Sequence, residues 1–408
     1  MDKGLNTAQQ ENQQQTAAPT GIVRDLLAGI APTAQQMKAE EDKLFASLLK
    51  PYTLEEHINN VTDKGDELST DYILNGANGY EERFTIPCNA LTFVVAPTSH
   101  GKSTVLQNLA LQVLRNKENE QREGTILYFS YEEDKDSVIM QLGNKFVNMD
   151  ISERMNKTNL RAIREFLTIG NHQPTPQDEN TKNEFLNRYN DFFARNIFSD
   201  KLTILDNDLR AAQFIRFLEY TVNHLQRKLK AVFVDYMQLI YSDDCNLPRR
   251  EELKEISNQL NKFAKTYNVP IVCAAQANRE TRSPLDMFSQ KIADSADLER
   301  IANKVLFVWN SAFAPQTSNT NEVKQLRAWS TTHGFTDKND TPAPTGYKKG
   351  KESAETAKDA PISWESGKMF FKLTKNRGGV VNICNTFDYN GNTGVITPAT
   401  KKPNHWDY

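Results

Sequence analysis

The chain has 408 residues, of which 25% are charged, and its formal net charge is −3. This length predicts about two to three domains or one enlarged α/β domain with extensions, and the nearly balanced charge excludes a polycation, so any nucleic acid must bind to local basic loops. The 4 cysteines form no C-x-x-C pair, which argues against a zinc site or a disulfide framework and favours a reducing cytosol. No run approaches about 18 apolar residues, and the polar N-terminus lacks an apolar signal segment, so we expect a cytoplasmic protein that does not bind membranes.

The first 67 residues differ in composition from the rest of the chain. Residues 1–20 are polar and rich in glutamine, which predicts a disordered tail. Residues 21–67 predict a short helical arm or linker, because two apolar groups recur there at helical spacing: Leu26, Leu27 and Ile30, then Leu44, Leu48 and Leu49. These helices are too small to form a domain, so we expect them to pack on the main body or on a neighbouring subunit.

Residues 68–408 predict one α/β domain with a mostly parallel sheet covered by helices on both faces. The reason is the alternation of short apolar runs with helical stretches. Strands are expected at 91–95, 125–130, 202–205, 231–234, 271–275, 305–309, 369–374 and 380–387, the last two forming a hairpin around Arg377-Gly378-Gly379. The segment 311–367 is rich in Thr, Asn, Lys, Gly and Pro, and we expect most of it to be a polar insertion.

The first strand and helix of this domain enclose a motif that suits phosphate. In "ALTFVVAPTSHGKSTVLQNLALQVL" an apolar strand enters a tight loop, and a helix follows at once, so that backbone N–H groups point at one spot. The pattern is G-x-x-x-x-G-K-[ST] with Ala96 in place of the first glycine. We expect ATP phosphates to bind Pro97, Thr98, Ser99, His100, Gly101, Lys102, Ser103 and Thr104, with Mg²⁺ at Ser103. A chance G-K-S in an ordinary strand-turn-helix unit is the alternative.

Hydrolysis needs further groups, and three strand ends downstream offer them. Asp235 ends the apolar run of "LKAVFVDYMQLI" and is a candidate magnesium ligand; the alternative is a carboxylate that caps a turn. Glu132 follows the strand of "TILYFSYEED" and is a candidate for orienting the attacking water, although surface acidic residues are common. Gln276 ends the strand of "VPIVCAAQANRETR" and is a candidate sensor of the γ-phosphate, or else a satisfied polar terminus.

Four segments, in order, resemble the C-terminal ATPase domain of DnaB-like replicative helicases. They are "APTSHGKST", "YFSYEE", "VFVDYMQLI" followed by "REELKEISNQLNKFAKTYNVPIVCAAQANR", and "KLTKNRGG". The resemblance covers about Leu68 to Phe387 outside the insertion. It implies a RecA-like fold, hydrolysis of ATP with Mg²⁺, assembly into a homo-oligomeric ring, hexameric in the family's manner, and single-stranded DNA in the central channel.

The resemblance also implies roles for individual residues. Lys102 and Ser103 bind phosphate and magnesium, Glu132 polarises the attacking water, Asp235 supports magnesium, and Gln276 couples the nucleotide to the DNA loops. It further implies that Lys375 and Arg377 reach into the neighbouring subunit's site as cations acting in trans, which is physically reasonable because charge on the transition state is then stabilised only in an assembled ring. A solvated hairpin tip is the alternative for these two residues.

DNA is expected at two loops, "SDDCNLPRREE" after the Asp235 strand and "NRETRSPLDMFSQKIADS" after the Gln276 strand. Phosphate contacts need cations but no base-specific groups, which suits a motor that crosses any sequence. The candidate contacts are Arg249, Arg250, Arg279, Arg282 and Lys291, and the alternative for each is a solvated surface cation. A primase or a helicase loader is a further candidate partner, although the family's helical N-terminal domain is absent or reduced to the short helices before Lys50.

Three hypotheses follow for the function. The leading one is an ATP-dependent, ring-forming helicase that translocates on single-stranded DNA in the replication of a phage, plasmid or other mobile element. The second is a RecA-type, ATP-regulated DNA-binding protein without unwinding activity, which a strand-displacement assay separates from the first. The third is a ring ATPase that acts as a partner-binding switch, which ATP-dependent but DNA-insensitive partner binding would favour.

Overall fold

The computed structural model describes most of the chain after residue 66. The described residues are 67–152, 158–168, 176–243, 246–288, 291–293, 296–316, 320–337 and 362–398. The predicted tail at 1–20 and nearly all of the predicted arm at 21–67 lie outside them, as does the 338–361 part of the predicted insertion.

The described strands form an 11-stranded sheet in the order β2-β1-β10-β9-β8-β3-β7-β6-β4-β5, with β11 paired to β10. Within that order, the strands β8, β3, β7, β6, β4 and β5 form a parallel block. The strands β9, β10, β1 and β2 are each antiparallel to their neighbours. The strands are β1 Glu67–Asn75, β2 Glu81–Pro87, β3 Leu91–Ala96, β4 Thr125–Ser130, β5 Leu202–Leu205, β6 Leu229–Asp235, β7 Ile271–Gln276, β8 Lys304–Asn310, β9 Lys368–Asn376, β10 Ile383–Tyr389 and β11 Ile396–Pro398.

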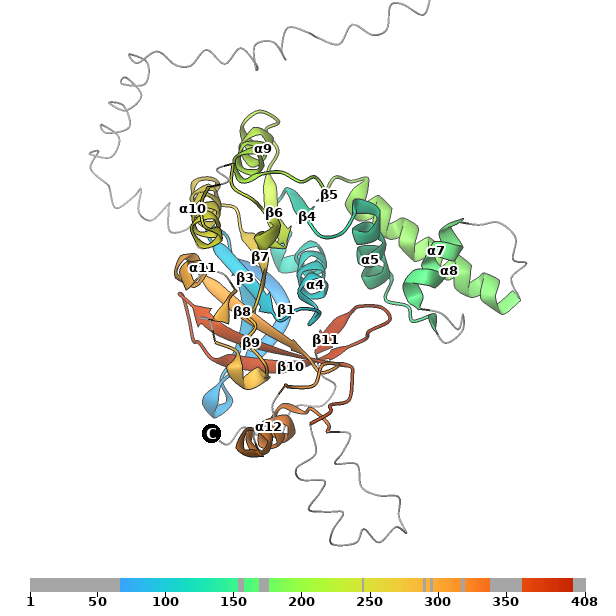
Figure 1. Ribbon diagram of the computed structural model, residues 1–408. Coiled ribbons are helices and arrows are strands. Elements are labelled where there is room, and N and C mark those ends of the chain that lie inside the picture. The colour runs from blue at the N-terminus through green and yellow to red at the C-terminus, as the bar shows by residue number, and fades with distance from the viewer. Residues whose placement is uncertain are drawn as a thin grey trace, which may run out of the picture. The chain divides into compact units, whose positions relative to one another are not determined.

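Helices cover both faces of the parallel block (Figure 1). The longer ones are α4 Lys102–Arg115, α5 Lys135–Val147, α7 Asn159–Thr168, α8 Pro176–Phe192, α9 Ala211–Asn223, α10 Arg249–Tyr267, α11 Ala296–Ile301 and α12 Thr320–His333. Short helical turns occur at Ala77–Gly79, Lys117–Asn119, Phe193–Ile197, Met237–Leu239 and Pro284–Asp286.

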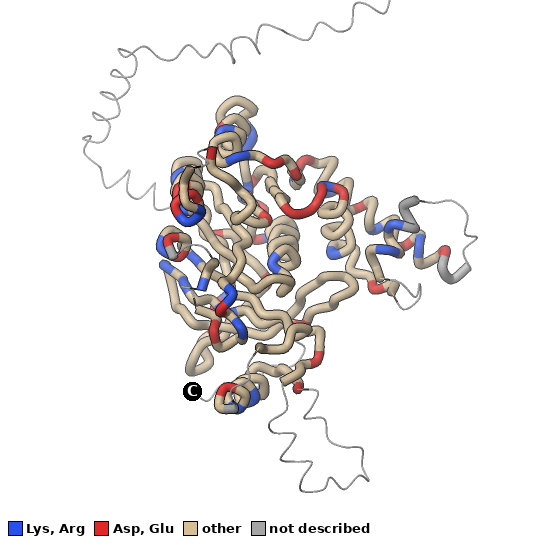
Figure 2. The backbone as a smooth tube through the Cα atoms, in the orientation of Figure 1, with Lys and Arg blue, Asp and Glu red and all other residues tan. Residues whose placement is uncertain are grey.

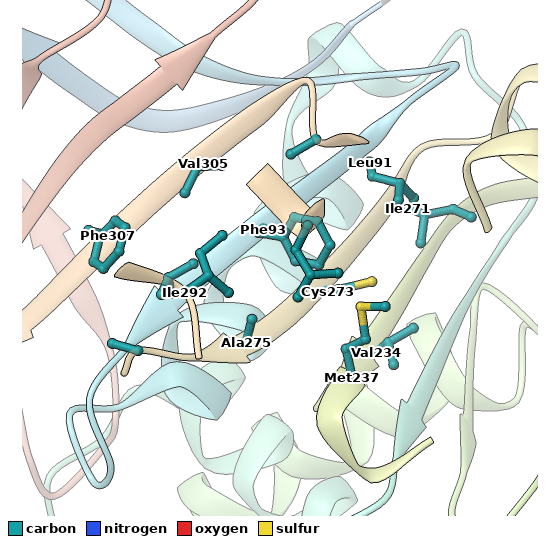
Figure 3. Close-up of a cluster of buried hydrophobic side chains, with 14 of the residues drawn as sticks. Leu91, Phe93, Val234, Met237, Ile271, Cys273, Ala275, Ile292, Val305 and Phe307 are labelled. Carbon is teal, nitrogen blue, oxygen red and sulfur yellow. The ribbon is translucent and has the colours of Figure 1, made fainter. Parts of the chain in front are cut away.

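Side chains along each buried strand point alternately to the two faces of the sheet, so the core is divided into one cluster on each face. In β3, Phe93 and Val95 belong to one cluster with α9, α10, α11 and α12, whereas Val94 and Ala96 belong to a second with α4 and α5. Figure 3 shows part of the first cluster, where Phe93 lies beside Cys273 of β7. Strands buried on both faces read as continuous apolar runs, which is why β3 to β8 are visible in the sequence. The predicted α/β class is confirmed.

The antiparallel side of the sheet contains strands that the sequence analysis did not predict, namely β1, β2 and β11. In β1 the burial alternates residue by residue along most of its length, and its apolar run is only three residues long, from Tyr72 to Leu74. The predicted hairpin is present as β9 and β10.

Helix α12 lies inside the segment predicted to be mostly a polar insertion. Its residues Val323 and Leu326 are buried in the core cluster, and Trp329 packs against the same cluster. The helix therefore depends on tertiary packing rather than on composition.

Helices α7 and α8 lie to one side of the sheet next to α5 and have an apolar cluster of their own (Figure 1). Its buried members include Ala162, Ile163, Phe185 and Tyr189. These helices extend the crossover between β4 and β5 into a small helical layer.

Candidate nucleotide-binding site

The loop between β3 and α4 has the backbone geometry of an anion site. Gly101 has a φ of +86°, and a side-chain carbon there would stand 2.7 Å from the methyl carbon of Met369. Only glycine tolerates both conditions without strain. Helix α4 begins at the next residue, Lys102, so the unpaired N–H groups of its first turn face the end of the loop.

A cavity of about 390 Å³ opens beside this loop. Most of the predicted phosphate-binding residues line it, and the predicted Glu132 and Gln276 do so as well. The described residues lining it are Thr98, Ser99, Gly101, Lys102, Ser103, Thr104, Glu132, Glu133, Gln141, Asn144, Lys145, Leu160, Tyr236, Gln276, Tyr389, Gly391, Asn392, Thr393 and Gly394.

The sheet brings these residues together because its parallel strands end at one edge. In the register of the sheet, Ala96 of β3 is paired with Gln276 of β7, and Ser130 of β4 is paired with Asp235 of β6. The Gln276 Nε2 donates a hydrogen bond to the Thr98 Oγ1 at 2.7 Å. A side chain predicted to sense nucleotide therefore contacts the phosphate loop directly.

Asp235 lies behind the loop, with only 4% of its surface exposed. The Tyr128 hydroxyl donates to its Oδ2 at 2.9 Å, while its Oδ1 has no hydrogen-bond partner among the described residues. Burial raises the pKa of Asp235 to about 6, and hydrogen bonds from Ser103 and Tyr128 oppose that rise. A buried carboxylate oxygen without a partner, next to a serine hydroxyl, fits a hard cation such as Mg²⁺.

Lys102 is buried between this carboxylate and the cavity. Burial lowers its pKa, and the negative charges of Asp235 and Glu132 oppose the change. Its Nζ lies 5.5 Å from the centre of the Tyr236 ring. The ammonium group lines the cavity and forms no ion pair with a carboxylate of the described residues, which leaves it available to an anionic ligand.

Glu132 is exposed and lines the cavity from the loop between β4 and α5. This loop carries the acidic run seen in Figure 2 beside α5. The Ser130 hydroxyl donates to the carbonyl of Glu133 at 2.6 Å, and the Glu133 N–H donates to the Ser130 Oγ at 3.1 Å. Ser130 therefore fixes the turn in which Glu132 stands.

Two predicted phosphate-binding residues, Pro97 and His100, are not among the described residues that line the cavity. The His100 ring stacks on Phe313 at 4.6 Å and meets the edge of Trp309 at 4.3 Å between ring centres. Its side chain anchors the loop to the core rather than facing the cavity.

The family model of the DnaB-like helicase C terminal domain matches residues 86–338, which is more than half of the chain. The chain belongs to this family. The resemblance to DnaB-like helicases is thereby confirmed, and three of its four motif segments lie within the matched residues, whereas "KLTKNRGG" lies beyond them.

Relatives of known sequence are similar over part of their length. Replicative DNA helicase DnaB of Mycoplasma pneumoniae is 37% identical over 84 residues, 20% of this chain and 18% of that protein. A probable plasmid replicative DNA helicase of Chlamydia psittaci is 32% identical over 108 residues, 26% of this chain and 23% of that protein. DnaB of Buchnera aphidicola (subsp. Schizaphis graminum) is 23% identical over 240 residues, 58% of this chain and 45% of that protein. These matches span less than half of each relative.

Two solved structures share the fold. One is the isolated ATPase domain of another protein, which has a TM-score of 0.51 at 14% identity, covering 76% of this chain and 85% of that chain. The other is a DnaB-like replicative helicase, solved with its interactions with primase, which has a TM-score of 0.50 at 14% identity, covering 76% and 59%. The predicted RecA-like fold of the DnaB family is thus confirmed. Among the described residues, no helix is long and apolar enough to cross a membrane.

The two cations that the DnaB resemblance assigns to a neighbouring subunit do not line the cavity formed by the described residues. The Lys375 Nζ donates to the backbone carbonyls of Glu299 and Arg300, the latter at 3.3 Å. The Arg377 Nη2 donates to the carbonyl of Arg300. Both side chains lie against the C-terminal end of α11, whose carbonyls attract cations.

The five candidate DNA contacts fall into two groups. Arg249, Arg250 and Lys291 have carboxylate partners: Arg249 pairs with Glu252, Arg250 with Asp297 at 3.4 Å, and Lys291 with Glu280 at 2.5 Å. Arg279 and Arg282 are exposed on the loop after β7.

The structure adds site residues that sequence reasoning did not single out. Tyr389 and residues 391–394 of the turn between β10 and β11 also line the cavity, and Tyr389 is hydrogen-bonded to Thr104. The turn is held by Asn108, whose Nδ2 donates to the Gly394 carbonyl at 2.9 Å, and by Asn144, whose Nδ2 donates to the Asn392 carbonyl at 2.9 Å. No motif marks these residues, because they come from three distant segments of the chain.

Proposed function

We propose that this protein is an ATP-driven, ring-forming DNA helicase that translocates on single-stranded DNA. The observation that carries the proposal is the convergence of Lys102, Glu132 and Gln276 on one cavity at the carboxyl edge of the sheet, with Asp235 buried behind it. Together these groups supply what phosphoryl transfer requires: a cradle for phosphate, a metal ligand and a carboxylate for the water.

In this proposal the triphosphate of ATP lies on the first turn of α4, with Lys102 beside its outer phosphates. Ser103 and Asp235 would hold Mg²⁺, whose positive charge would offset negative charge on the phosphate oxygens. Glu132 accepts a hydrogen bond from the attacking water and aligns it with the γ-phosphate. The Tyr389 ring also lines the cavity and offers an aromatic surface for stacking on the base.

We assign Lys375 and Arg377 to the site of the next subunit in a homo-oligomeric ring, a hexamer as the family resemblance implies. Their place outside their own cavity supports this assignment, since no residue of the same hairpin tip lines it among the described residues. A cation delivered by a neighbour stabilises the transition state only at a formed interface, so assembly and turnover are coupled.

Single-stranded DNA is proposed to contact the loops that follow β6 and β7. Asp235 and Gln276 end these same strands, and Gln276 also bonds Thr98 of the phosphate loop. A change at the phosphates therefore has a direct physical connection to the loop that holds Arg279 and Arg282. Exposed guanidinium groups bind phosphate irrespective of base sequence, as a translocating motor needs.

We place the protein in the replication of a phage, plasmid or other mobile element, as one similar protein is a probable plasmid helicase. A primase or loader is proposed as a partner on the precedent of a DnaB-like helicase solved with primase. The predicted helical arm at 21–67 is the proposed site of subunit or partner contacts.

The deciding experiment measures ATP hydrolysis with and without single-stranded DNA, alongside the mass of the protein in solution. A hexamer-sized species whose turnover rises with DNA supports the proposal, and ATP-dependent strand displacement then separates a helicase from an ATP-regulated DNA-binding protein. Lys102→Ala removes the phosphate-facing charge and is expected to abolish turnover. Normal hydrolysis by Lys102→Ala, or a monomer indifferent to DNA, would refute the proposal.

A further inference from the structure

A buried lysine lines the nucleotide cavity, and the proposed chemistry does not use it. Lys145 of α5 is 5% exposed and lines the cavity together with the turn at residues 391–394. The turn packs so closely on it that a side-chain carbon at Gly394 would stand 2.9 Å from the Lys145 Nζ. Burying an ammonium group is costly unless it is hydrogen-bonded, so its partner is informative.

That partner begins a chain of directed hydrogen bonds across two helices. The Lys145 Nζ donates to the Gln107 Oε1 at 2.7 Å, and the Gln107 Nε2 donates to the Gln141 Oε1 at 2.8 Å. The Gln141 Nε2 then donates to a carboxylate oxygen of Glu133. Gln107 belongs to α4 and is 1% exposed, whereas Lys145, Gln141 and Glu133 line the cavity, so the chain links α4 and α5 beside the cavity.

The charges at its two ends fix the direction of this chain. An ammonium group only donates and a carboxylate only accepts, so each glutamine must turn its oxygen toward Lys145 and its nitrogen toward Glu133. If either amide were flipped, its nitrogen would face another donor and its oxygen would face another acceptor. Bonds aligned in this way polarise and strengthen one another.

We propose that Lys145, Gln107 and Gln141 form a positioning relay that holds Glu133, and with it the loop bearing Glu132, in place beside the nucleotide. The relay residues act through Glu133 and do not touch the reacting atoms. Because Lys145 also lies against the turn at residues 391–394, which lines the cavity, the relay connects that turn to the water-activating loop. The expected effect on the rate of ATP hydrolysis rests on the proposed ATPase function, whereas the expected effect on the loop that bears Glu132 does not.

The charge state of Lys145 provides a signature of the relay. Burial lowers its pKa to about 8, opposed by the negative charges of Glu133 and Asp235, which are the charged groups acting on it. The ammonium is present below that pH and is lost above it. With the relay in place, the kcat for ATP hydrolysis is expected to fall above about pH 8 as the first donor of the chain weakens.

The test compares four variants in the full-length protein. Lys145→Met and Gln107→Leu remove links at nearly constant volume, and Gln107→Glu keeps the bond to Lys145 but has no N–H for Gln141. Lys135→Met is the matched control, since Lys135 is an exposed lysine at the start of the same helix. Backbone hydrogen exchange of residues 131–134 is measured together with kcat, KM and the urea midpoint of unfolding.

The relay predicts about tenfold faster exchange of residues 131–134 in the three relay variants and no change in the control. It predicts kcat lower by about tenfold to a hundredfold with KM changed less than about twofold, and no fall above pH 8 in Lys145→Met. The urea midpoint of Lys145→Met is expected to change little, because removal of a desolvated charge offsets the loss of the donor to the buried Gln107 Oε1.

Exchange at residues 131–134 that is unchanged in both Gln107→Leu and Lys145→Met overturns the relay. The relay is also overturned if the relay variants lose kcat only together with a lower urea midpoint of unfolding. If the wild-type protein hydrolyses no ATP, the proposed function fails, and the exchange measurement still decides the relay.

Discussion

Burial sets the charge of individual side chains, and two histidines illustrate this. His333, 9% exposed, lies within 2.8 Å of the Trp329 carbonyl through its Nδ1 and stacks on the Trp329 ring. Burial lowers its pKa to about 4, and the neighbouring Lys372 acts in the same direction. Burial also lowers the pKa of His100 to about 4, with a smaller contribution from the Lys102 charge. Both rings are therefore neutral at pH 7.

These shifts predict a loss of stability in mild acid. A histidine with a folded pKa near 4 and an unfolded pKa near 6.5 binds more protons when unfolded, so the free energy of unfolding falls as the pH drops from 6.5 toward 4. At pH 5 each of the two histidines is expected to cost about 2 kcal/mol. Urea unfolding at pH 7 and pH 5 measures this, and His333→Asn should reduce the difference between the two values.

His224, which is exposed at the C-terminal end of α9, supplies the control. The loss of stability between pH 7 and pH 5 is therefore compared among His224→Asn, His333→Asn and the wild type. A His333→Asn protein that loses as much stability as the wild type would show that His333 does not titrate on unfolding.

The sequence could identify individual site residues only where they belong to a local motif. Lys102, Ser103 and Asp235 follow apolar strands, and parallel strands deliver their ends to one edge, so their proximity was predictable. Lys145 and Gln107 read as ordinary polar residues of two helices. Their contact depends on how α4 and α5 pack, and no spacing in the sequence encodes that.

Among the strands and helices too, some could be predicted from a local sequence pattern, whereas others depend on tertiary packing. The parallel strands were predictable because burial on both faces leaves a continuous apolar run. Helix α12 was not, because the Thr, Asn and Lys residues around it suggest a loop. The apolar side chains that hold it to the core are spaced along a mostly polar helix, at Val323, Leu326 and Trp329.

The dependence of α12 on packing yields a prediction. Leu326→Ala removes a fully buried side chain from the core cluster and should lower the free energy of unfolding by about 2–5 kcal/mol. Gln325→Ala, at the exposed neighbouring position of the same helix, should change it by less than about 0.5 kcal/mol. Urea unfolding of both variants makes the comparison, and equal stabilities would mean that α12 is not docked on the sheet in solution.

For the whole molecule, the proposed ring divides each active site between two subunits. Arg377→Ala and Glu132→Gln should each lose turnover by about a thousandfold or more. Mixed rings should recover activity, because an Arg377→Ala subunit keeps Glu132 and its Glu132→Gln neighbour keeps Arg377. With random mixing, about a quarter of the interfaces pair the two intact groups.

The matched control mixes Glu132→Gln with Lys102→Ala. Both changes affect groups of the same cavity, so no arrangement of these subunits restores a complete site, and no recovery is expected. Recovery in this control, or its absence with Arg377→Ala in rings shown to be mixed, would count against a cation acting in trans.

The order of strands in the sheet affects how the protein folds during its synthesis. β1 is the first described strand, yet its neighbour in the sheet is β10, and Asn75 is paired with Cys384. On the ribosome, the hairpin of β1 and β2 leaves the exit tunnel long before that neighbour has been synthesised. Such distant pairing folds slowly and leaves a strand edge open to other chains. We therefore expect synthesis of this protein to depend on chaperones that shield the nascent β1 edge until β10 emerges.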